Sequence, residues 1–574
     1  MITAHKNVRI LVSLLKQHGI RHLVLSPGGR NMSIVKSVED DPFFTCYSVV
    51  DERSAAYFAV GLTLEVRGPV GLCCTSAQAT RNYLPGMTEA FYRKAPIVAI
   101  TADYDLNFTD QMNMQSIRQL SIPSDSAVTS VDLPIVKDQN DEYLVTRRVN
   151  EALDALTRNG GGPSHINIRI SQHWIKGDDE LETFRKITRH TQADKAWPPI
   201  GRKKVLLVIG QHHPFSKAEE AAIEAFSAAH DVAIYVNHIS NYNGTKTIHG
   251  NLRLAAGNPS GLVPDLLITI GGYLGDYPLD GMLKRENIEH WRVCEDGNFG
   301  DTYNSLSRVF ECTDQTFFER YAHDSGTNEG SGYVDLWRQE INRTRIPDHL
   351  PMSHAVVAKS MAHLIPNNAN LHLAILNSMR FWEYFDIDTS VKCYSNVAGF
   401  GIDGCMSTFL GHSAANDNLN FLVIGDLSFF YDMNSIGIRS LKNNIRIILV
   451  NNHGGGEFRI KTSPAEAFGE LSNRHIAAGG HFGESAEGWV LNNGFDYIAV
   501  KTHEELLAAG PAFVSERTRP VIMEVFTTMS DEATALQTIM DANDFTPQSE
   551  KLAQSIKNAI PTDVKNSIKK ILGR

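Results

Sequence analysis

Short apolar runs alternate with longer amphipathic stretches through most of the chain, and this alternation constrains the fold more than any other feature. The runs are rich in Val, Ile and Leu, which is typical of buried strands. They are residues 22–29, 44–52, 71–78, 97–103, 205–211, 232–237, 266–272, 291–296, 371–378, 421–426, 445–452, 495–500 and 521–527. Stretches between them place apolar residues at helical spacing, which predicts helices at 53–66, 79–92 and 217–230. Strands and helices in regular alternation are typical of a parallel sheet whose crossover connections are helices. The pattern therefore predicts an α/β protein.

The alternation occurs in three sets, which two polar segments separate. The first set begins at residue 20, the second follows the Trp- and Pro-containing segment 194–204, and the third follows the Gly- and Asn-rich segment 323–333. Because 574 residues are too many for one hydrophobic core, each set is interpreted as a domain. The first and third sets share one rhythm and could be two copies of one fold. We expect doubly wound parallel-sheet domains at residues 1–180, 181–345 and 346–545, followed by a basic amphipathic tail at 546–574.

The composition favours a globular protein that acts on small molecules. A net charge of −11 argues against the Lys/Arg excess that nucleic-acid binding needs. The seven Cys follow no framework spacing and indicate reduced thiols, so we expect a cytoplasmic protein. No stretch has the length and apolarity of a membrane span. The tail is expected to dock on the protein as a helix, and contact with an anionic membrane is the less favoured alternative.

Residues 421–458 read as strand, turn, helix, strand and Gly-rich loop, which is one βαβ unit. The crossover makes the two strands parallel, so Asp426 and Asn452 leave the sheet at the same edge, where α/β folds bind ligands. One carboxylate oxygen, one amide oxygen and a backbone carbonyl such as that of Gly454 suit a hard divalent cation, Mg²⁺ or Mn²⁺. The unit therefore predicts a metal site at Asp426, Asn452 and Gly454.

The same unit offers hydrogen-bond donors for phosphate. Backbone N–H groups at the turn and at the start of the following helix suit an anion, and the glycines after Asn452 let the chain approach a ligand closely. We therefore expect a metal-bound diphosphate in contact with Gly425, Asp426, Leu427, Ser428, Asn452, Gly454 and Gly455.

A competing pattern lies just upstream. Residues 399–404 have the G-x-G-x-x-G spacing of dinucleotide-binding proteins, and Asp426 ends a strand 22 residues later. However, the residues before these glycines make a poor buried strand. A dinucleotide site also leaves Asn451, Asn452 and the glycine triplet unexplained, so the metal–diphosphate interpretation is favoured.

Longer segments of the first and third sets resemble a known family. Gly425-Asp426 followed by Asn451-Asn452 resembles the signature of thiamine-diphosphate enzymes. The surrounding segments resemble one branch of the thiamine-diphosphate enzymes. This branch is the MenD family of menaquinone biosynthesis, which makes 2-succinyl-5-enolpyruvyl-6-hydroxy-3-cyclohexene-1-carboxylate. The segments that carry the resemblance are LSPGGR (25–30), DERSAAYFAVGL (51–62), CTSAQATRNYLPGMTEA (74–90), ITAD (100–103), 113–115, YSN (394–396), GIDGCMSTFLG (401–411), GDLSFFYDMN (425–434) and VNNHGGGEF (450–458).

The resemblance implies thiamine diphosphate as cofactor and a catalytic carboxylate at Glu52. In this family that carboxylate hydrogen-bonds the aminopyrimidine ring and favours the imino tautomer, which takes the proton from the thiazolium ring. Ile402 matches the aliphatic residue that holds the cofactor in a bent shape. Further cofactor contacts are implied at Ser26, Pro27, Gly28, Thr75, Ser76, Asn82, Ser378 and Gly401.

The resemblance also implies an activity and an assembly. The expected reaction decarboxylates a 2-oxo acid and transfers the acyl fragment to an acceptor. A simple decarboxylase and, less favoured, a non-catalytic cofactor-binding protein are the alternatives. A homodimer or homotetramer is expected, because in this family Glu52 and Asp426 would serve one site from two subunits. Some thiamine enzymes bind FAD in the central domain, but the segment after residue 210 lacks a phosphate-cradling glycine cluster, so we expect none.

The substrate positions match the family only in part. Where the family has three arginines for dicarboxylic substrates, this chain has Tyr104, Val397 and either Phe381 or Trp382. We therefore expect the family's chemistry with altered substrates, and the aromatic residues could form a wall for a different acceptor, such as a sugar or a nucleotide-linked keto compound. The candidates to bind the donor carboxylate are Arg30, Gln115, Asn377 and Arg380.

Overall fold

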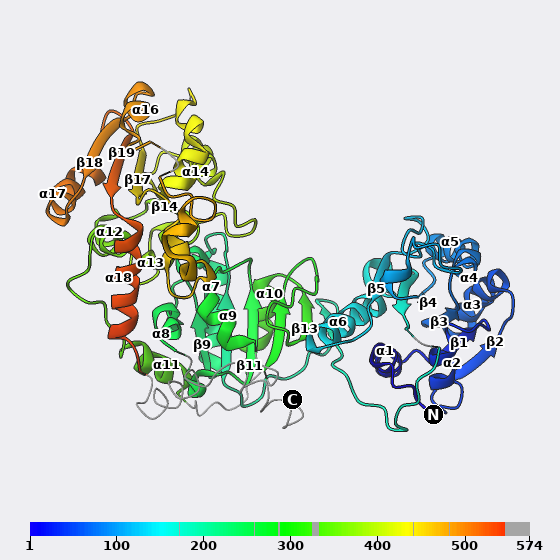
Figure 1. Ribbon diagram of the computed structural model, residues 1–574. Coiled ribbons are helices and arrows are strands. Elements are labelled where there is room, and N and C mark those ends of the chain that lie inside the picture. Colours follow the sequence, from blue (N-terminus) through cyan, green and yellow to red (C-terminus); the bar gives the residue numbers. More distant parts are fainter. Residues whose placement is uncertain are drawn as a thin grey trace, which may run out of the picture. The chain divides into compact units, whose positions relative to one another are not determined.

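The computed structural model describes residues 1–171, 173–257, 259–284, 288–323, 332–439, 441–480 and 483–545. The chain forms two compact units (Figure 1). The first contains residues 1–197 and 295–312, and the second contains 198–294 and 313–574. The predicted tail at 546–574 lies outside the described residues. In the part of the chain that is described, no helix combines the length and the apolarity needed to span a bilayer.

A six-stranded parallel sheet organises the first unit. Its strand order is β2-β1-β3-β4-β6-β5. Strand β1 pairs with both β2 and β3, so the chain crosses over β1 between β2 and β3. The strands are β1 (His22–Leu25), β2 (Thr45–Ser48), β3 (Val70–Cys74), β4 (Ile97–Asp103), β5 (Thr129–Leu133) and β6 (Ser164–Arg169).

Helices cover both faces of this sheet. Side chains alternate along each strand: Leu23 and Leu25 belong to one hydrophobic core, and Val24 belongs to the other. The first core includes side chains of α1 (Lys6–Gln17), α2 (Met32–Val38) and α6 (Gln139–Ala155). The second core includes those of α3 (Glu52–Val66), α4 (Gln78–Asn82) and α5 (Leu84–Arg93). The first unit also contains the parallel pair β7 (Thr188–Thr191) and β13 (Leu306–Glu311), with short 3₁₀ turns η1 (Leu106–Phe108) and η2 (Arg158–Gly160).

A second parallel sheet lies in the central part of the chain. In the second unit its strands run in the order β10-β9-β8-β11-β12. Its first helix, α7 (Lys217–Ala229), begins at a capping box of Ser216 and Glu219, and it matches the helix predicted at 217–230. The strands are β8 (Val205–Ile209), β9 (Val232–Tyr235), β10 (Thr247–Ile248), β11 (Leu266–Ile270) and β12 (Glu289–Val293). The other helices are α8 (Asn251–Ala255), α9 (Tyr277–Leu283), α10 (Asp314–Ala322) and α11 (Tyr333–Ile341), with the 3₁₀ turn η3 (His238–Ser240).

The third sheet has the order β15-β14-β16-β17-β19-β18 and is parallel throughout. Counted from its own first strand, this is the strand order of the first sheet, so the shared sequence rhythm corresponds to a shared topology. The strands are β14 (Asn370–Leu373), β15 (Lys392–Tyr394), β16 (Asn420–Gly425), β17 (Ile445–Asn451), β18 (Asp496–Val500) and β19 (Val521–Phe526). The helices are α12 (His354–Met361), α13 (Asn377–Trp382), α14 (Cys405–Ala414), α15 (Asp426–Tyr431), α16 (Glu487–Asn492), α17 (His503–Val514) and α18 (Met529–Ala542).

Two cores again alternate along the strands of the third sheet. Phe421 and Val423 point into one core, and Leu422 and Ile424 point into the other. Three parallel sheets with helical connections confirm the predicted α/β fold class.

Two details differ from the sequence expectations. The single helix expected at 79–92 is two helices, α4 and α5, which meet at Tyr83, because Pro85 in the first turn of α5 cannot continue a helix from α4. Strands β5 and β6 extend the first sheet, although no apolar run was singled out there.

Candidate functional site

Asp426, Asn452 and Gly454 meet at the carboxyl edge of the third sheet. Asp426 directly follows β16, and Asn452 directly follows the neighbouring strand β17. The backbone N–H of Gly454 donates to Asp426 Oδ2 at 2.9 Å and to Asn452 Oδ1 at 3.1 Å. The N–H of Gly454 therefore brings the side chains of Asp426 and Asn452 together, as predicted for two metal ligands. The competing dinucleotide pattern does not account for this position of Asn452.

The charge of Asp426 is poorly compensated by the protein. Only 4% of this residue is exposed, and burial raises the pKa of its carboxyl group to about 6, although the N–H groups of Leu427 and Gly454 donate to it. A bound cation would favour the ionised form that burial disfavours. Carboxylate, amide and carbonyl oxygens form the donor set that Mg²⁺ takes alongside phosphate oxygens. The residues present thus fit a metal-bound diphosphate.

The glycine loop after Asn452 packs too closely for side chains. Gly454 has φ +158°, and a Cβ there would lie 2.9 Å from Met529 Sδ and 3.0 Å from Ala477 O. The N–H of Gly455 donates to the same Ala477 carbonyl at 2.6 Å. The packing and this hydrogen bond fix the loop next to Asp426 and Asn452.

Two further segments of the second unit adjoin this loop. Ser428 Oγ donates to the carbonyl of Ile402, which ties the loop containing Gly401 and Ile402 to α15. A Cβ on Gly456 would lie 3.0 Å from Asn452 Nδ2 and 3.4 Å from Asn377 Nδ2, so the start of α13, with Asn377 and the buried Ser378, lies beside the metal loop.

Arg380 is committed to another side chain. Its guanidinium pairs with both carboxylate oxygens of Glu457, at 2.7 and 2.9 Å, and it donates to Asn377 Oδ1 at 2.6 Å. The ion pair raises the pKa of Arg380. A substrate carboxylate would have to compete with Glu457 for this arginine, which weakens the case for Arg380 as a donor-binding residue.

No local sequence pattern indicates one buried pair that lies close to Asp426. His354, the first residue of α12, donates its backbone N–H to Glu532 at 3.0 Å, and its Nδ1 lies 2.9 Å from Glu532 Oε1. Thr527 Oγ1 also donates to Glu532. His354 Nε2 is buried without a hydrogen-bond partner among the described residues, and the charge of a protonated His354 lowers the pKa of Asp426. Glu532 thus orients a ring nitrogen that is free to bind a ligand oxygen.

Replacing His354 with Gln is expected to weaken Mg²⁺-dependent binding of thiamine diphosphate about 10- to 100-fold, the usual effect of losing a supporting contact at a metal site. The reason is that the ring nitrogen oriented by Glu532 disappears. Titration calorimetry with Mg²⁺ present measures the loss. His363→Gln, at an exposed position two turns later, is the matched control. Unchanged affinity in the His354 variant would contradict the assignment.

In the first unit, the residues implied by the resemblance lie at the carboxyl ends of β1, β2 and β3. Glu52 begins α3 directly after its N-cap Asp51, and it is half-buried. Asn82 Nδ2 donates to Glu52 Oε2 at 3.3 Å. The carboxylate is therefore held at one oxygen, and the other remains available to a ligand.

The segment after β1, with Ser26, Pro27 and Gly28, packs against the end of the parallel neighbour β3. A Cβ on Gly28 would lie 2.3 Å from Thr75 Cβ, so only glycine fits there. Tyr83 donates through its hydroxyl to Ser26 Oγ at 3.3 Å. Ser76 Oγ is buried without a hydrogen-bond partner in the described part of the chain. An unpaired buried hydroxyl at a sheet edge suits a ligand contact, as the resemblance implies.

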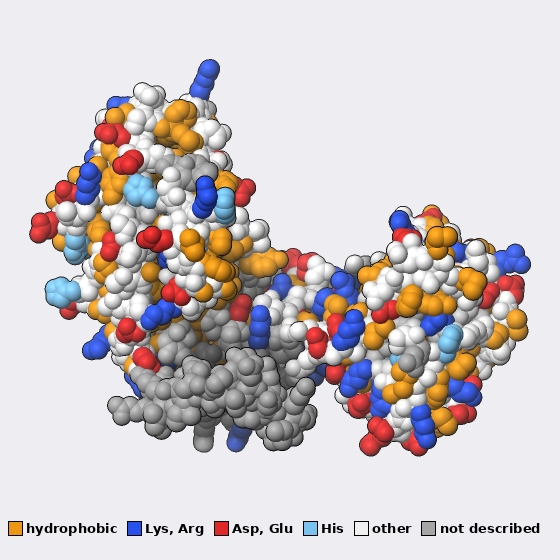
Figure 2. Space-filling view, in the orientation of Figure 1, with side chains coloured by type: hydrophobic (Ala, Val, Ile, Leu, Met, Phe, Trp, Pro, Cys, Tyr) orange, Lys and Arg blue, Asp and Glu red, His pale blue; other side chains and the backbone are white. Residues whose placement is uncertain are grey.

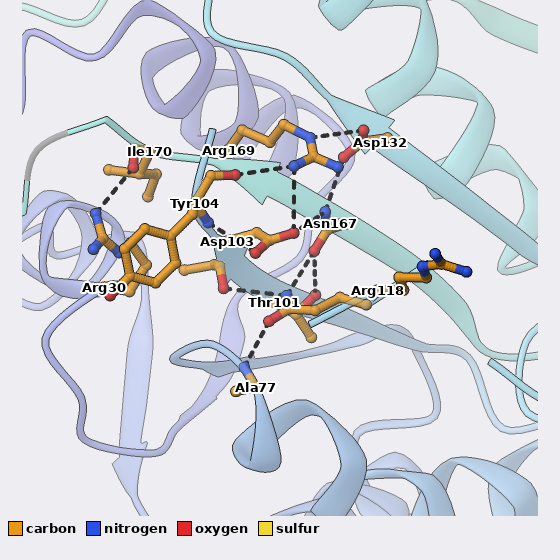
Figure 3. A network of polar contacts seen from close by, with 12 residues as sticks. Arg30, Ala77, Thr101, Asp103, Tyr104, Arg118, Asp132, Asn167, Arg169 and Ile170 are labelled. Carbon is orange, nitrogen blue, oxygen red and sulfur yellow. Dashed lines mark hydrogen bonds and ion pairs between the residues drawn. The ribbon is translucent and has the colours of Figure 1, made fainter. Parts of the chain in front are cut away.

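Arg30 and Tyr104 stack on each other at this edge. The guanidinium carbon of Arg30 lies 3.7 Å from the centre of the Tyr104 ring (Figure 3). Arg30 Nη1 donates to the carbonyl of Ile170 at 3.1 Å, and its buried Nε has no hydrogen-bond partner among the described residues. The backbone of Tyr104 is fixed by Asp103, which accepts from its N–H, and by Arg169, which donates to its carbonyl. Gln115 is exposed, and no described hydrogen bond joins it to Arg30.

The prediction that Phe381 and Trp382 line an aromatic wall is wrong. Phe381 is 1% exposed and Trp382 is fully buried, and both pack in the hydrophobic core of the third sheet. Val397 belongs to the same core. The two aromatic side chains face inward because α13 covers the sheet with that side. Tyr104 packs against Arg30 instead.

Known proteins are similar to this chain over nearly its whole length. The family model described as "Thiamine pyrophosphate enzyme, N-terminal TPP binding domain" matches residues 6–122. A 2-succinyl-5-enolpyruvyl-6-hydroxy-3-cyclohexene-1-carboxylate synthase of Phocaeicola vulgatus is 35% identical over 94% of this chain and 98% of its own length. The protein of the same name from Bacteroides thetaiotaomicron is 33% identical with the same coverage, and that of Porphyromonas gingivalis is 30% identical over 93% and 96%.

These similarities confirm the predicted cofactors, thiamine diphosphate with a divalent metal ion, and the predicted reaction. The chain is an enzyme that decarboxylates a 2-oxo acid and transfers the acyl fragment to an acceptor. It belongs to the thiamine-diphosphate-dependent family of 2-succinyl-5-enolpyruvyl-6-hydroxy-3-cyclohexene-1-carboxylate synthases.

Proposed function

We propose that Asp426, Asn452 and Gly454 hold the metal ion and diphosphate of the cofactor, and that Glu52 is the catalytic carboxylate. This proposal rests on the backbone N–H of Gly454, which donates to both Asp426 and Asn452. When bound, thiamine diphosphate supplies the electron sink for decarboxylation. Glu52, held by Asn82, shares a proton with a nitrogen of the cofactor's pyrimidine ring. Gly28, packed against Thr75, and Ile402 would orient the cofactor, and the buried surroundings of Asp426 would exclude water from the metal.

The donor is proposed to be 2-oxoglutarate. The relatives' printed name contains a 2-succinyl group, which is the acyl fragment that 2-oxoglutarate leaves after losing carbon dioxide. Arg30 supports this choice, because it is a buried cation with no acidic partner among the described residues and an unpaired Nε. A guanidinium of this kind suits a carboxylate. Arg30 therefore binds the donor carboxylate, while its stacking on Tyr104 keeps the group in place.

A panel of 2-oxo acids tests the donor. The protein is incubated with thiamine diphosphate, Mg²⁺ and one of 2-oxoglutarate, pyruvate or 2-oxobutyrate, and carbon dioxide is measured with and without added aldehydes. We expect release from 2-oxoglutarate above the monocarboxylic acids, and a coupled product only when an aldehyde is present. Preference for pyruvate would refute the donor, and release without any coupled product would favour a simple decarboxylase.

We also propose that the working protein is a homodimer or homotetramer. Helix α3, which begins at Glu52, exposes large apolar side chains: Tyr57 is 48% exposed, Phe58 42% and Leu64 61%. Hydrophobic side chains gather on the visible face of the first unit (Figure 2). Apolar clusters of this kind mark protein interfaces. A second copy covering α3 would place Glu52 at a subunit boundary.

Phe58→Lys is expected to convert the oligomer to monomers and to abolish carbon dioxide release. The reason is that a positive charge on the apolar face of α3 cannot be buried in an interface without an oppositely charged partner. Light scattering coupled to size-exclusion chromatography gives the mass, and circular dichroism checks the fold. Leu507→Lys, at an exposed apolar residue of α17, is the control. A folded Phe58→Lys oligomer of unchanged mass would contradict the proposed interface.

A further inference from the structure

Two histidines and one glutamate gather in the second unit, outside the proposed Mg²⁺ site. One ligand atom of each of His238, His249 and Glu383 lies within 4.8 Å of those of the other two. The described residues contain no other group of three or more His, Cys, Asp or Glu side chains that come as close together. We infer that His238, His249 and Glu383 form a second metal site, which binds Zn²⁺. The inference goes beyond the proposed function and does not depend on it.

The three residues come from two distant segments of the second unit. His238 begins η3, and His249 directly follows β10, so both belong to the part of the chain that builds the central sheet. Glu383 directly follows α13, which covers the third sheet. A metal ion bound by all three would therefore join the loops of the central sheet to a helix of the third sheet.

The ring of His238 is held in the way that is usual for a metal-binding histidine. Its Nε2 lies 2.9 Å from the carbonyl oxygen of Trp382 and 3.1 Å from that of Phe385. A carbonyl oxygen only accepts, so Nε2 carries the proton and Nδ1 of the neutral ring keeps its lone pair. No described hydrogen bond uses Nδ1. A backbone carbonyl that holds one ring nitrogen while the other nitrogen binds the ion is the common arrangement at metal sites.

The second imidazole, that of His249, lies beside the first. The centres of the two rings are 5.9 Å apart, and their planes are inclined by 47°. His249 is exposed, and no described hydrogen bond or ion pair uses its ring nitrogens, so a metal ion would displace no protein partner from it. Two ligand atoms on one tetrahedral Zn²⁺ lie about 3.3 Å apart, because each Zn–N bond is about 2.0–2.1 Å long. Rotation of the exposed His249 side chain is enough to close the remaining gap.

Glu383 supplies a negative charge to the group. Only 8% of this residue is exposed, and its two carboxylate oxygens accept the backbone N–H of His238 at 3.0 and 3.2 Å. No Lys or Arg of the described residues forms an ion pair with it. A carboxylate that is buried without a cation is costly, and its oxygens retain lone pairs for a further partner. A bound metal ion would compensate the charge of Glu383 and use these lone pairs.

The two imidazoles favour a transition metal over Mg²⁺. Two imidazole nitrogens and one carboxylate oxygen form a ligand set that Zn²⁺ takes at sites with three protein ligands and one position open to water. Mg²⁺ prefers oxygen ligands throughout, as at Asp426 and Asn452. The second unit thus offers two different metal sites, and an excess of Mg²⁺ should leave the site of His238, His249 and Glu383 available to Zn²⁺.

Titration of the full chain with Zn²⁺ tests the inference. The protein is dialysed against EDTA, then saturated with thiamine diphosphate and excess Mg²⁺, and Zn²⁺ is added in a calorimeter. We expect one equivalent of Zn²⁺ to bind and to raise the melting temperature, because a ligand that binds only the folded chain stabilises it. Co²⁺ should bind in its place and give the intense visible absorption of a tetrahedral site, whereas Co²⁺ in an octahedral Mg²⁺ site absorbs weakly. Absence of Zn²⁺ binding overturns the inference.

Two single variants link the bound Zn²⁺ to these residues. His249→Gln and Glu383→Gln are each expected to weaken Zn²⁺ binding at least about 100-fold, because losing a ligand costs more than the roughly 10- to 100-fold that a supporting contact contributes. Both should fold: His249 is exposed, and the amide oxygen of Glu383→Gln can still accept the His238 N–H. Parental Zn²⁺ affinity in either folded variant overturns the inference.

Two controls separate this site from other binding sites for Zn²⁺. His213→Gln changes a histidine after β8 whose side chain is 69% exposed, and it should bind Zn²⁺ as the parent does. Asp426→Ala removes a ligand of the proposed Mg²⁺ site, and it should also keep parental Zn²⁺ affinity. Loss of Zn²⁺ binding in either control would place the ion elsewhere and refute the inference. Failure of Mg²⁺-dependent cofactor binding in the parent would refute the proposed function alone.

Discussion

Replacing Glu52 with Gln is expected to lower cofactor-dependent carbon dioxide release by about 10²- to 10⁴-fold, the range that a positioned acid–base group contributes. The amide occupies the same space but cannot take up or share the proton of a pyrimidine nitrogen. Asn82 can still contact position 52, because an amide oxygen also accepts its hydrogen bond. The loss should therefore appear in kcat, with cofactor affinity little changed. Release from saturating 2-oxo acid and thiamine diphosphate measures it.

Glu65→Gln is the matched control for Glu52. Glu65 lies on the same helix, in its last turn, and is exposed. The substitution removes the same charge from α3 without touching the strand ends, so full activity is expected. Full decarboxylation by the Glu52 variant would sink the proposed role. A Glu52 variant that loses cofactor binding instead of turnover would assign the carboxylate to binding alone.

Asp426→Ala is expected to weaken Mg²⁺-dependent binding of thiamine diphosphate at least about 100-fold, or roughly 3 kcal/mol. The carboxylate is the only charged member of the proposed ligand set, and it also accepts the N–H of Gly454, so its removal takes away a metal ligand and loosens the glycine loop. Calorimetry in Mg²⁺ and after treatment with EDTA separates the metal-dependent part. The parent protein should also melt at higher temperature with Mg²⁺ and cofactor together, and the variant should not.

Asp417→Ala controls for the loss of a carboxylate from the third sheet. Asp417 precedes β16, its side chain is 96% exposed, and it pairs with Lys442. A surface pair of this kind contributes about 0–1 kcal/mol, so binding and stability should be nearly unchanged. Cofactor binding by Asp426→Ala that still responds to Mg²⁺ with parental affinity would show that the metal lies elsewhere.

Patterns along the chain were sufficient to predict the fold class and to predict that Asp426 and Asn452 lie at the same edge of the third sheet. The apolar runs correspond to β1 to β4, β8, β9, β11, β12, β14 and β16 to β19. Apart from the edge strands β2 and β18, they are largely buried, as continuous apolar runs in a parallel sheet are. Asp426 and Asn452 could be placed together because strand ends of one βαβ unit lie at one edge. Their roles as ligands, like those of the other predicted site residues, remain predictions. The domain limits at residues 180, 345 and 545 are also predictions.

The side-chain environment of the third sheet could not be predicted in the same way. Phe381 and Trp382 look like pocket residues in the sequence, but the direction of α13 turns both into the core. His354 and Glu532 are 178 residues apart, and no local pattern links them. The sequence does not show that Arg380 has an acidic partner, whereas in the structure it forms an ion pair with Glu457. Each of these outcomes depends on partners distant in the chain.

The sequence by itself determined the α/β class and the strand ends that carry Asp426 and Asn452, because periodicity and turn chemistry are local properties. The resemblance of its motifs to thiamine-diphosphate enzymes indicated the cofactor family and Glu52. Only the tertiary structure decided the charge of a cavity of about 520 Å³ in the second unit, which Asp276, Arg380, Glu383 and Glu457 line. Arg380 and Glu383 belong to α13 and its end, whereas Asp276 and Glu457 come from distant segments. Arg380 pairs with Glu457, which leaves the other two carboxyl groups without a described cationic partner. Electrostatic preference depends on which charges are neutralised by neighbours and which are buried alone, and that is fixed by packing rather than by order along the chain.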